Sequence, residues 1–126
     1  MQSVAQKILV VDDEEYVRQM IQLKLEEEGF VVRTAHDEAS CLSVVKDFQP
    51  DLILMDVMLD DLSGLDTVEV LKKDEATKAI PVLVLTGRSF DEDRKEAMEV
   101  GAVGFITKPI LPTRLIQQIK RYLIQK

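Results

Sequence analysis

Four short apolar runs recur along the chain, and each is followed directly by polar residues. Residues 8–11 precede Asp12-Asp13, residues 52–55 precede Asp56, residues 82–85 precede Thr86, and residues 103–106 precede Thr107-Lys108-Pro109. The segments between these runs place their apolar residues at helical spacing. Runs of this length between helical segments are typical of strands in a parallel sheet covered on both faces. The pattern therefore predicts an α/β protein.

Local start and stop signals support this alternation. Asp37 is a suitable N-cap for one helix, and Gly29 is a suitable left-handed stop for the helix before it. The predicted strands span residues 8–11, 30–35, 52–55, 82–85 and 103–106, and the predicted helices span 14–28, 37–49, 64–72, 90–101 and 112–123. Arg33 makes the second strand polar, which places it at the sheet edge. Five strands alternating with five helices indicate right-handed βαβ crossovers.

The polar residues after the strands carry the candidate chemistry. Ligands of open α/β sheets bind outside the carboxyl ends of the strands, so Asp12, Asp13, Asp56, Thr86 and Lys108 should converge there. Neighbouring carboxylates raise one another's pKa, so the group requires a cation. Mg²⁺ fits, because it uses one or two carboxylates and keeps several waters. We expect Asp13 and Asp56 to be direct ligands and Asp12 to act through water.

Such a site is suited to accept a phosphoryl group, because this transfer depends mainly on positioning and charge neutralisation. Asp56 is the predicted nucleophile because it ends a central strand, and its product would be an acyl phosphate. Lys108 and the Thr86 hydroxyl could hold the added oxygens. Gly87 would leave space beside Thr86 for that approach.

Each of these residues also has a simpler explanation when taken alone. The Asp12-Asp13 pair could be a helix cap with a solvated neighbour, and Asp56 could be the start of a loop. Thr86 could cap a helix, and Lys108 could be a surface lysine before a proline. Their joint occurrence after four separate strands favours a chemical site.

Composition narrows the class of protein further. The chain has 126 residues, of which 46% are hydrophobic, and this suits one globular domain spanning residues 1–126. A net charge of −7 disfavours direct binding to nucleic acid or to an anionic membrane. The apolar runs are far shorter than the roughly 20 residues of a membrane span, and the N-terminus lacks a secretory signal, so we expect a cytoplasmic protein. Cys41 is the single cysteine, which excludes an intrachain disulfide and a cysteine zinc cluster.

Several spaced motifs together resemble the receiver domain of bacterial two-component response regulators. They are Val10-Val-Asp-Asp-Glu14, Asp51-Leu-Ile-Leu-Met-Asp56, Gly64, Leu85-Thr-Gly87 and Lys108-Pro109. The resemblance covers about residues 7–123. It implies a flavodoxin-like, doubly wound parallel sheet of five strands in the order 2-1-3-4-5, with five helices.

The resemblance also implies roles for individual residues. Asp56 would receive a phosphoryl group from a histidine kinase or a histidine phosphotransfer protein. Asp12, Asp13, Asp56 and the backbone carbonyl of Met58 would bind Mg²⁺, for which Mn²⁺ could substitute. Lys108 would bridge to the phosphoryl group.

A conformational switch is implied as well. Thr86 and Phe105 would form the switch pair, and the Lys108-Pro109 peptide bond would be cis. The fourth helix, fifth strand and fifth helix would form the surface for a downstream protein or for an output domain missing from this chain. We therefore expect a phosphorelay switch that catalyses only its own phosphorylation and slow dephosphorylation, and not a turnover enzyme.

The chain departs from the family pattern at three places. Leu59-Asp60 replaces the usual Met-Pro, and with Asp61 we interpret it as a solvated acidic loop. Met58 and Arg88 occupy the positions that flank the path of the hydrolytic water, so the lifetime of the acyl phosphate is not predicted. No output domain follows the last helix, so this is either a stand-alone regulator or a receiver cut from a longer chain.

Two other classes share parts of this pattern. A haloacid dehalogenase-type hydrolase also uses an aspartate nucleophile and Mg²⁺, but it has an Asp-x-Asp motif and a cap domain, whereas Asp12 and Asp13 are adjacent. A flavodoxin-like electron carrier cradles phosphate with hydroxyl and glycine residues in its first loop. The acidic segment from Asp12 to Glu15 would repel that phosphate.

Overall fold

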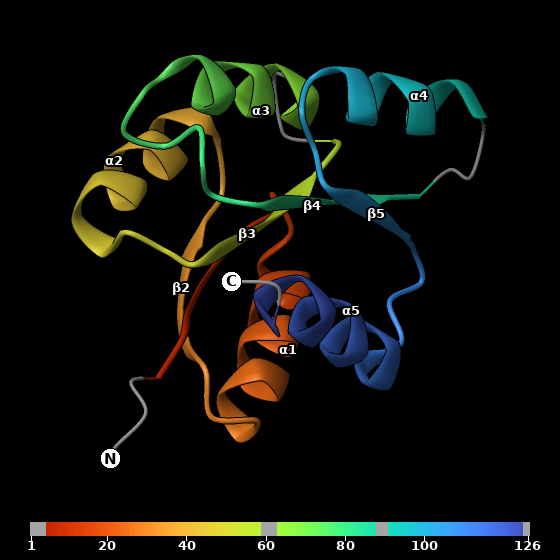
Figure 1. Ribbon diagram of the computed structural model, residues 1–126. Coiled ribbons are helices and arrows are strands. Elements are labelled where there is room, and N and C mark those ends of the chain that lie inside the picture. The colour runs from red at the N-terminus through yellow and green to blue at the C-terminus, as the bar shows by residue number, and fades with distance from the viewer. Residues whose placement is uncertain (1–4, 59–62, 88–90, 125–126) are drawn as a thin grey trace.

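The strands and helices alternate along the whole chain, as the apolar pattern predicts (Figure 1). The computed structural model describes residues 5–58, 63–87 and 91–124. Its elements are β1 (Lys7–Val11), α1 (Glu15–Glu27), β2 (Val31–Ala35), α2 (Glu38–Phe48), β3 (Leu52–Asp56), α3 (Gly64–Lys73), β4 (Val82–Thr86), α4 (Asp91–Glu99), β5 (Gly104–Thr107) and α5 (Pro112–Ile124). The predicted elements are therefore confirmed, with boundaries shifted by a few residues at most.

The five strands form one parallel sheet in the order β2-β1-β3-β4-β5. This order confirms the flavodoxin-like topology. β2 lies at one edge, where Arg33 is exposed, as its polar sequence indicates. The order reverses between β1 and β3, and their carboxyl ends therefore flank the place where ligands bind in sheets of this kind.

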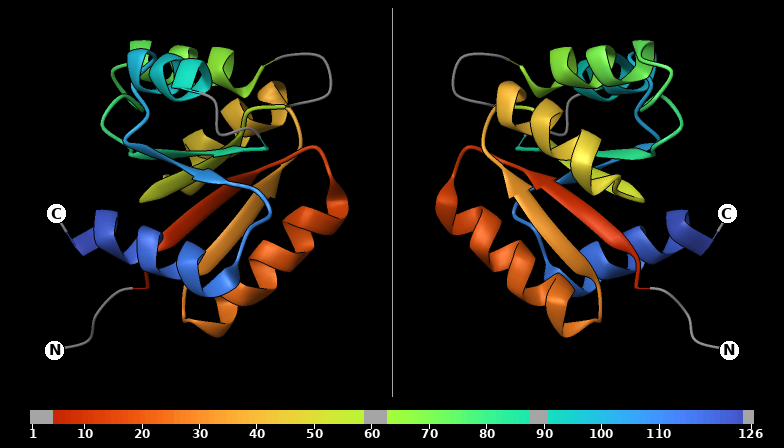
Figure 2. Two further views of the ribbon diagram at one scale, coloured as in Figure 1. Left: turned by 90° about the vertical axis from the view of Figure 1, so that its right-hand side faces the viewer. Right: turned by 90° about the vertical axis from the view of Figure 1, so that its left-hand side faces the viewer.

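Helices cover both faces of the sheet (Figure 2). α1 and α5 pack on one face through Ile21, Leu25 and Leu115. The opposite face is covered by α2, α3 and α4, and its core includes Val45 and Val68. The central strands β3 and β4 are buried along their whole length, because successive side chains enter the two cores in turn. This explains the uninterrupted apolar runs.

The helix ends follow the sequence signals. The Asp37 carboxylate accepts a hydrogen bond from the backbone N–H of Ser40, in a capping box at the start of α2. Gly29 has a φ of 93° and ends α1 in the left-handed conformation. α2 ends at Phe48, and its C-cap Gln49, directly before Pro50, has a φ of 50°. Within the described ranges, no helix has the length and apolar character needed to cross a membrane.

Candidate functional site

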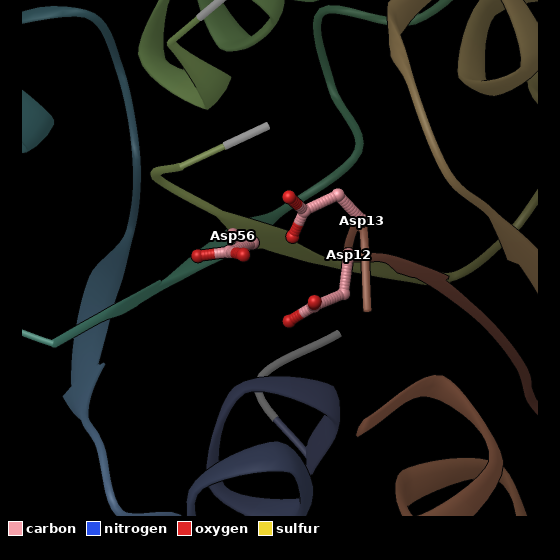
Figure 3. Close-up of side chains that lie close together, drawn as sticks. All are labelled: Asp12, Asp13 and Asp56. Carbon is pink, nitrogen blue, oxygen red and sulfur yellow. The ribbon is translucent and has the colours of Figure 1, made fainter. Parts of the chain in front are cut away.

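Three carboxylates converge at the carboxyl ends of β1 and β3 (Figure 3). Asp12 and Asp13 directly follow β1, and Asp56 is the last residue of β3. One oxygen from each lies within 4.8 Å of the others. Asp12 and Asp56 are buried, whereas Asp13 is partly exposed. Burying two neighbouring carboxylates is unfavourable without positive charge beside them.

Lys108 brings one positive charge to this group. It directly follows β5, and its Nζ lies 3.3 Å from Oδ2 of Asp12 and 3.4 Å from Oδ1 of Asp56. The backbone N–H of Lys108 donates to the carbonyl of Thr86 at 2.7 Å, which ties it to the end of β4. The Lys108-Pro109 peptide bond is cis. Residues from four strands, β1, β3, β4 and β5, thus meet at the carboxyl ends of the sheet.

The pKa directions show that the lysine does not neutralise the site by itself. Burial, followed by the charge of Asp12, raises the pKa of Asp56 to about 6, although Lys108 acts in the opposite direction. Burial alone would lower the pKa of Lys108, but the charges of Asp56 and Asp12 outweigh it and raise that pKa. The carboxylates therefore remain short of positive charge, which suits a divalent cation with oxygen ligands.

The two aspartates after β1 differ in the hydrogen-bond and ion-pair partners of their carboxylate oxygens. Oδ1 of Asp12 accepts a hydrogen bond from the backbone N–H of Glu14 at 2.9 Å, and its Oδ2 faces Lys108. Asp13 makes no side-chain hydrogen bond or ion pair with the residues that the structure describes. Its carboxylate is thus free of those partners, and the acidic cluster could hold a metal ion.

Arg18 supports the same turn, and the sequence reasoning missed it. Its guanidinium donates to the backbone carbonyl of Asp12 at 2.7 Å, and its backbone N–H donates to the carbonyl of Glu14. Both contacts hold the turn between β1 and α1. Spacing shows that a residue one turn inside a helix can reach back to the preceding turn, but it does not show that Arg18 does so.

Gly64 positions the loop that follows the candidate nucleophile. A Cβ atom at Gly64 would overlap the backbone carbonyl of Asp56. The Gly64 N–H donates to the carbonyl of Val57 at 2.6 Å, and Met58 pairs with Ser63 in an isolated β-bridge. The start of α3 is therefore packed directly against the end of β3.

Met58 lies beside the site. Its backbone N–H donates to Oδ1 of Asp56 at 3.2 Å, and its side chain is 68% exposed. The role of its backbone carbonyl as a metal ligand remains a prediction. Leu59, Asp60, Asp61 and Arg88 lie outside the described residues, so the predictions made for them are not addressed.

Thr86 and Phe105 lie on the same face of the sheet. Val84 is paired with Phe105 in the register of β4 and β5, and Thr86 is two residues beyond Val84. Thr86 is buried, and a Cβ atom at the adjacent Gly87 would meet nothing within 4 Å. Phe105 is half-buried, with the Arg94 guanidinium 4.6 Å from its ring centre.

With this geometry in view, comparisons with known proteins decide the family. The family model described as "Response regulator receiver domain" matches residues 8–120. The chain belongs to the response regulator receiver family. Membership of that family favours neither a dehalogenase-type hydrolase nor a flavodoxin-like electron carrier.

Individual relatives agree. The chain is 43% identical over 117 residues to the phosphate regulon transcriptional regulatory protein PhoB of Klebsiella pneumoniae, covering 93% of this chain and 51% of PhoB. It is 32% identical over 120 residues to the DNA-binding response regulator MtrA of Mycolicibacterium smegmatis, covering 95% of this chain and 51% of MtrA. The chain spans about half the length of these curated relatives.

A solved structure of similar size matches over nearly its full length. The chemotaxis protein CheY4 of Vibrio cholerae superposes with a TM-score of 0.90 at 31% identity, covering 94% of this chain and 98% of CheY4. The receiver fold and the family assignment therefore rest on both sequence and structure.

Proposed function

We propose that residues 1–126 form a single receiver domain that works as a phosphorelay switch, with Asp56 as the phosphoacceptor. The observation that carries this proposal is the burial of Asp56 between Asp12, Asp13 and Lys108 at the carboxyl ends of the strands. The donor is the phosphohistidine of a histidine kinase or histidine phosphotransfer protein. We place the protein in the cytoplasm, where such donors present their phosphohistidine.

The residues present fit Mg²⁺, with Mn²⁺ as a substitute. Asp13, Asp56 and the backbone carbonyl of Met58 would be the direct ligands, and Asp12, whose oxygens already face Glu14 and Lys108, would act through water. The ion, when bound, supplies positive charge to the oxygens of the phosphoryl group during transfer.

The chain's own residues perform the remaining steps. A carboxylate oxygen of Asp56 forms a bond to phosphorus while the phosphorus–nitrogen bond of the donor breaks, and the imidazole keeps the electron pair of that bond. The Lys108 ammonium, already 3.4 Å from Oδ1 of Asp56, binds an oxygen of the arriving group. The Thr86 hydroxyl binds another oxygen and moves toward the site.

This movement sets the switch. When Thr86 moves inward, Phe105 can occupy the space beside it on the same face of the sheet. The acyl phosphate thereby changes the free-energy difference between two conformers by roughly 2–3 kcal/mol. The surface of α4, β5 and α5 carries the change to a downstream protein or to an output domain in a longer chain.

The acyl phosphate ends by slow hydrolysis within the same site, at a rate that depends on Met58 and Arg88. Met58 has an exposed side chain two residues after Asp56, and the direction of its effect on the lifetime is not predicted. The protein therefore turns over only its own phosphoryl group.

Small phosphoryl donors test the proposal. Acetyl phosphate with Mg²⁺ should add one phosphoryl group to the wild-type protein, as measured by intact mass, and none to Asp56→Asn. Asp47→Asn, which changes an exposed aspartate on α2, is the matched control and should label like the wild type. Equal labelling of wild type and Asp56→Asn would contradict the assignment.

A further inference from the structure

The direction of the Asp13 side chain depends on the backbone around it. Its carboxylate makes no hydrogen bond or ion pair with the residues that the structure describes, whereas the Asp12 carboxylate is held by Glu14 and Lys108. In Figure 3 the two aspartates leave neighbouring backbone positions, and both carboxylates turn toward Asp56. Since no described residue holds the end of the Asp13 side chain, the peptide groups on either side of its Cα atom set where the carboxylate points.

Arg18 holds the first of these two peptide groups. Its Nη1 donates to the carbonyl oxygen of Asp12 at 2.7 Å, and this carbonyl belongs to the peptide group between Asp12 and Asp13. The next peptide group is held by the Asp12 carboxylate, whose Oδ1 accepts from the backbone N–H of Glu14 at 2.9 Å. A peptide group is planar, so restricting both groups restricts φ and ψ of Asp13 and with them the direction of its Cα–Cβ bond.

The position of Arg18 is itself fixed by α1. The helix begins at Glu15, three residues before Arg18, and helical side chains lean toward the N-terminus of their helix. The backbone N–H of Arg18 donates to the Glu14 carbonyl at 3.1 Å, and its side chain is partly buried. The guanidinium therefore reaches the turn before the helix from an anchored place on the helix.

Helix stability alone does not explain this contact. The first turn of α1 carries the acidic Glu15, which suits the helix dipole, whereas a cation at the same end opposes the dipole. The guanidinium binds the backbone of Asp12 and not a carboxylate, and it forms no ion pair with a side chain in the described ranges. The contact therefore orders the backbone and leaves the carboxylate oxygens available for a metal ion.

We propose that Arg18 is a positioning residue of the metal site. By holding the peptide group between Asp12 and Asp13, it aims the Asp13 carboxylate at the space shared with Asp56. Residues that orient metal ligands in this way contribute to metal affinity without touching the metal. The inference rests on the proposed function, since it requires Asp13 to be a direct ligand of Mg²⁺.

Charge and positioning predict opposite effects when Arg18 is replaced. A guanidinium near the site repels Mg²⁺, so its removal would strengthen metal binding if only its charge mattered. If Arg18 aims Asp13, its removal weakens metal binding, because the Asp13 carboxylate then samples several directions. The sign of the change in affinity therefore separates the two roles.

NMR titration of the full chain with Mg²⁺ measures this sign. Arg18→Met keeps an aliphatic side chain and removes the hydrogen bond, and we expect it to weaken Mg²⁺ binding by about tenfold. Arg18→Lys can still donate one hydrogen bond to the Asp12 carbonyl and should recover part of the affinity. Arg121→Met removes an arginine from the last turn of α5 and should bind Mg²⁺ like the wild type.

Double variants test whether the effect passes through Asp13. Adding Arg18→Met to Asp13→Asn should change Mg²⁺ affinity by less than about twofold, because the ligand that Arg18 positions is already lost. Adding Arg18→Met to Asp12→Asn should still weaken binding by about tenfold, because the peptide group before Asp13 is still present. A general disturbance of the turn would weaken binding in both backgrounds.

A measurement without metal tests the positioning itself. The backbone N–H of Asp13 belongs to the same peptide group as the Asp12 carbonyl, so its NMR order parameter reports how firmly that group is held. In metal-free Arg18→Met it should fall from about 0.85, the value of rigid backbone, toward about 0.6. Arg18→Lys should show a smaller fall, and Arg121→Met should show none.

Three outcomes would overturn the inference. They are an Arg18→Met protein that binds Mg²⁺ as tightly as the wild type or more tightly, equal weakening with and without the Asp13 carboxylate, and an unchanged order parameter at Asp13. If any of these occurs while acetyl phosphate and Mg²⁺ label Asp56, the role of Arg18 fails and the proposed function stands. A wild type that neither binds Mg²⁺ nor becomes labelled at Asp56 would remove both.

Discussion

Gly64 lies so close to the backbone carbonyl of Asp56 that a Cβ atom there would overlap the oxygen. The two residues are eight positions apart in the sequence, and the contact joins the end of β3 to the first turn of α3. The spacing therefore has a steric reason: a hydrogen is the only side chain that fits between the helix start and the candidate nucleophile.

Replacing Gly64 should disturb both stability and phosphorylation. We expect Gly64→Ala to lower the free energy of unfolding by about 1–3 kcal/mol, because the methyl group forces the loop away from Asp56. Gly87→Ala is the matched control for the unfolding measurement only, since a Cβ atom there meets nothing within 4 Å. Urea unfolding and the rate of labelling by acetyl phosphate measure the two effects, and a Gly64→Ala protein with wild-type values in both would show that the contact is not restrictive.

The stability of the metal-free protein should depend on pH through Asp56. Its pKa is about 6 in the folded protein against an ordinary 3.8, so the folded state holds the proton more tightly than the unfolded chain does. The free energy of unfolding should therefore fall as pH rises from about 4 to about 6 and stay level above that range. Asp56→Asn should remove this dependence and be more stable than wild type near pH 7, by about 1–3 kcal/mol.

Urea titrations with a chelator at about pH 5 and about pH 7.5 measure this difference. Added Mg²⁺ should restore the wild type at the higher pH and leave Asp56→Asn largely unaffected. If the difference in free energy of unfolding between wild type and Asp56→Asn were the same at both pH values, the raised pKa of Asp56 would be contradicted.

Metal affinity should separate the two aspartates after β1. Asp13→Asn should weaken Mg²⁺ binding by about tenfold or more, because this carboxylate has no competing partner among the described residues, whereas Asp12 already faces Glu14 and Lys108. Asp12→Asn should weaken it less. Calorimetric titration measures both, with the exposed Glu15→Gln as control, and retention of wild-type affinity by Asp13→Asn would rule out its role as a direct ligand.

The switch pair should be visible by NMR. Beryllofluoride should shift the signals of Phe105 and of residues 91–101, because Phe105 and Thr86 share one face of the sheet and Arg94 lies on the Phe105 ring. Thr86→Ala should reduce these shifts while Asp56 is still labelled by acetyl phosphate. Shifts confined to the loop after Asp56 would show that the chain binds the phosphoryl mimic without switching.

Much of the fold could be predicted because the apolar and polar positions of each strand match its place in the sheet. The apolar runs are continuous where strands are buried on both faces, and Arg33 marks the edge strand. The carboxylate cluster could be predicted because parallel strands have their carboxyl ends on the same side of the sheet. This brings Asp12 and Asp56 together.

Other features could not be predicted because they depend on side-chain geometry across elements. The contact of Arg18 with the carbonyl of Asp12 depends on the angle at which α1 leaves β1. The contact of Arg94 with the Phe105 ring depends on how α4 packs against β5. Periodicity specifies which face of a helix is buried, but it does not specify which exposed side chains meet.

Mapping the position of the phosphoryl group tests the assignment of Asp56 most directly. A phosphorylated histidine phosphotransfer protein is mixed with the chain and Mg²⁺, and borohydride then reduces the acyl phosphate so that the modified aspartate is found as homoserine in peptide sequencing. We expect homoserine at position 56 alone, in an amount equal to the phosphoryl group lost by the donor. Homoserine at Asp12 or Asp13, or loss of phosphate from the donor with no modified aspartate, would contradict a phosphorelay through Asp56.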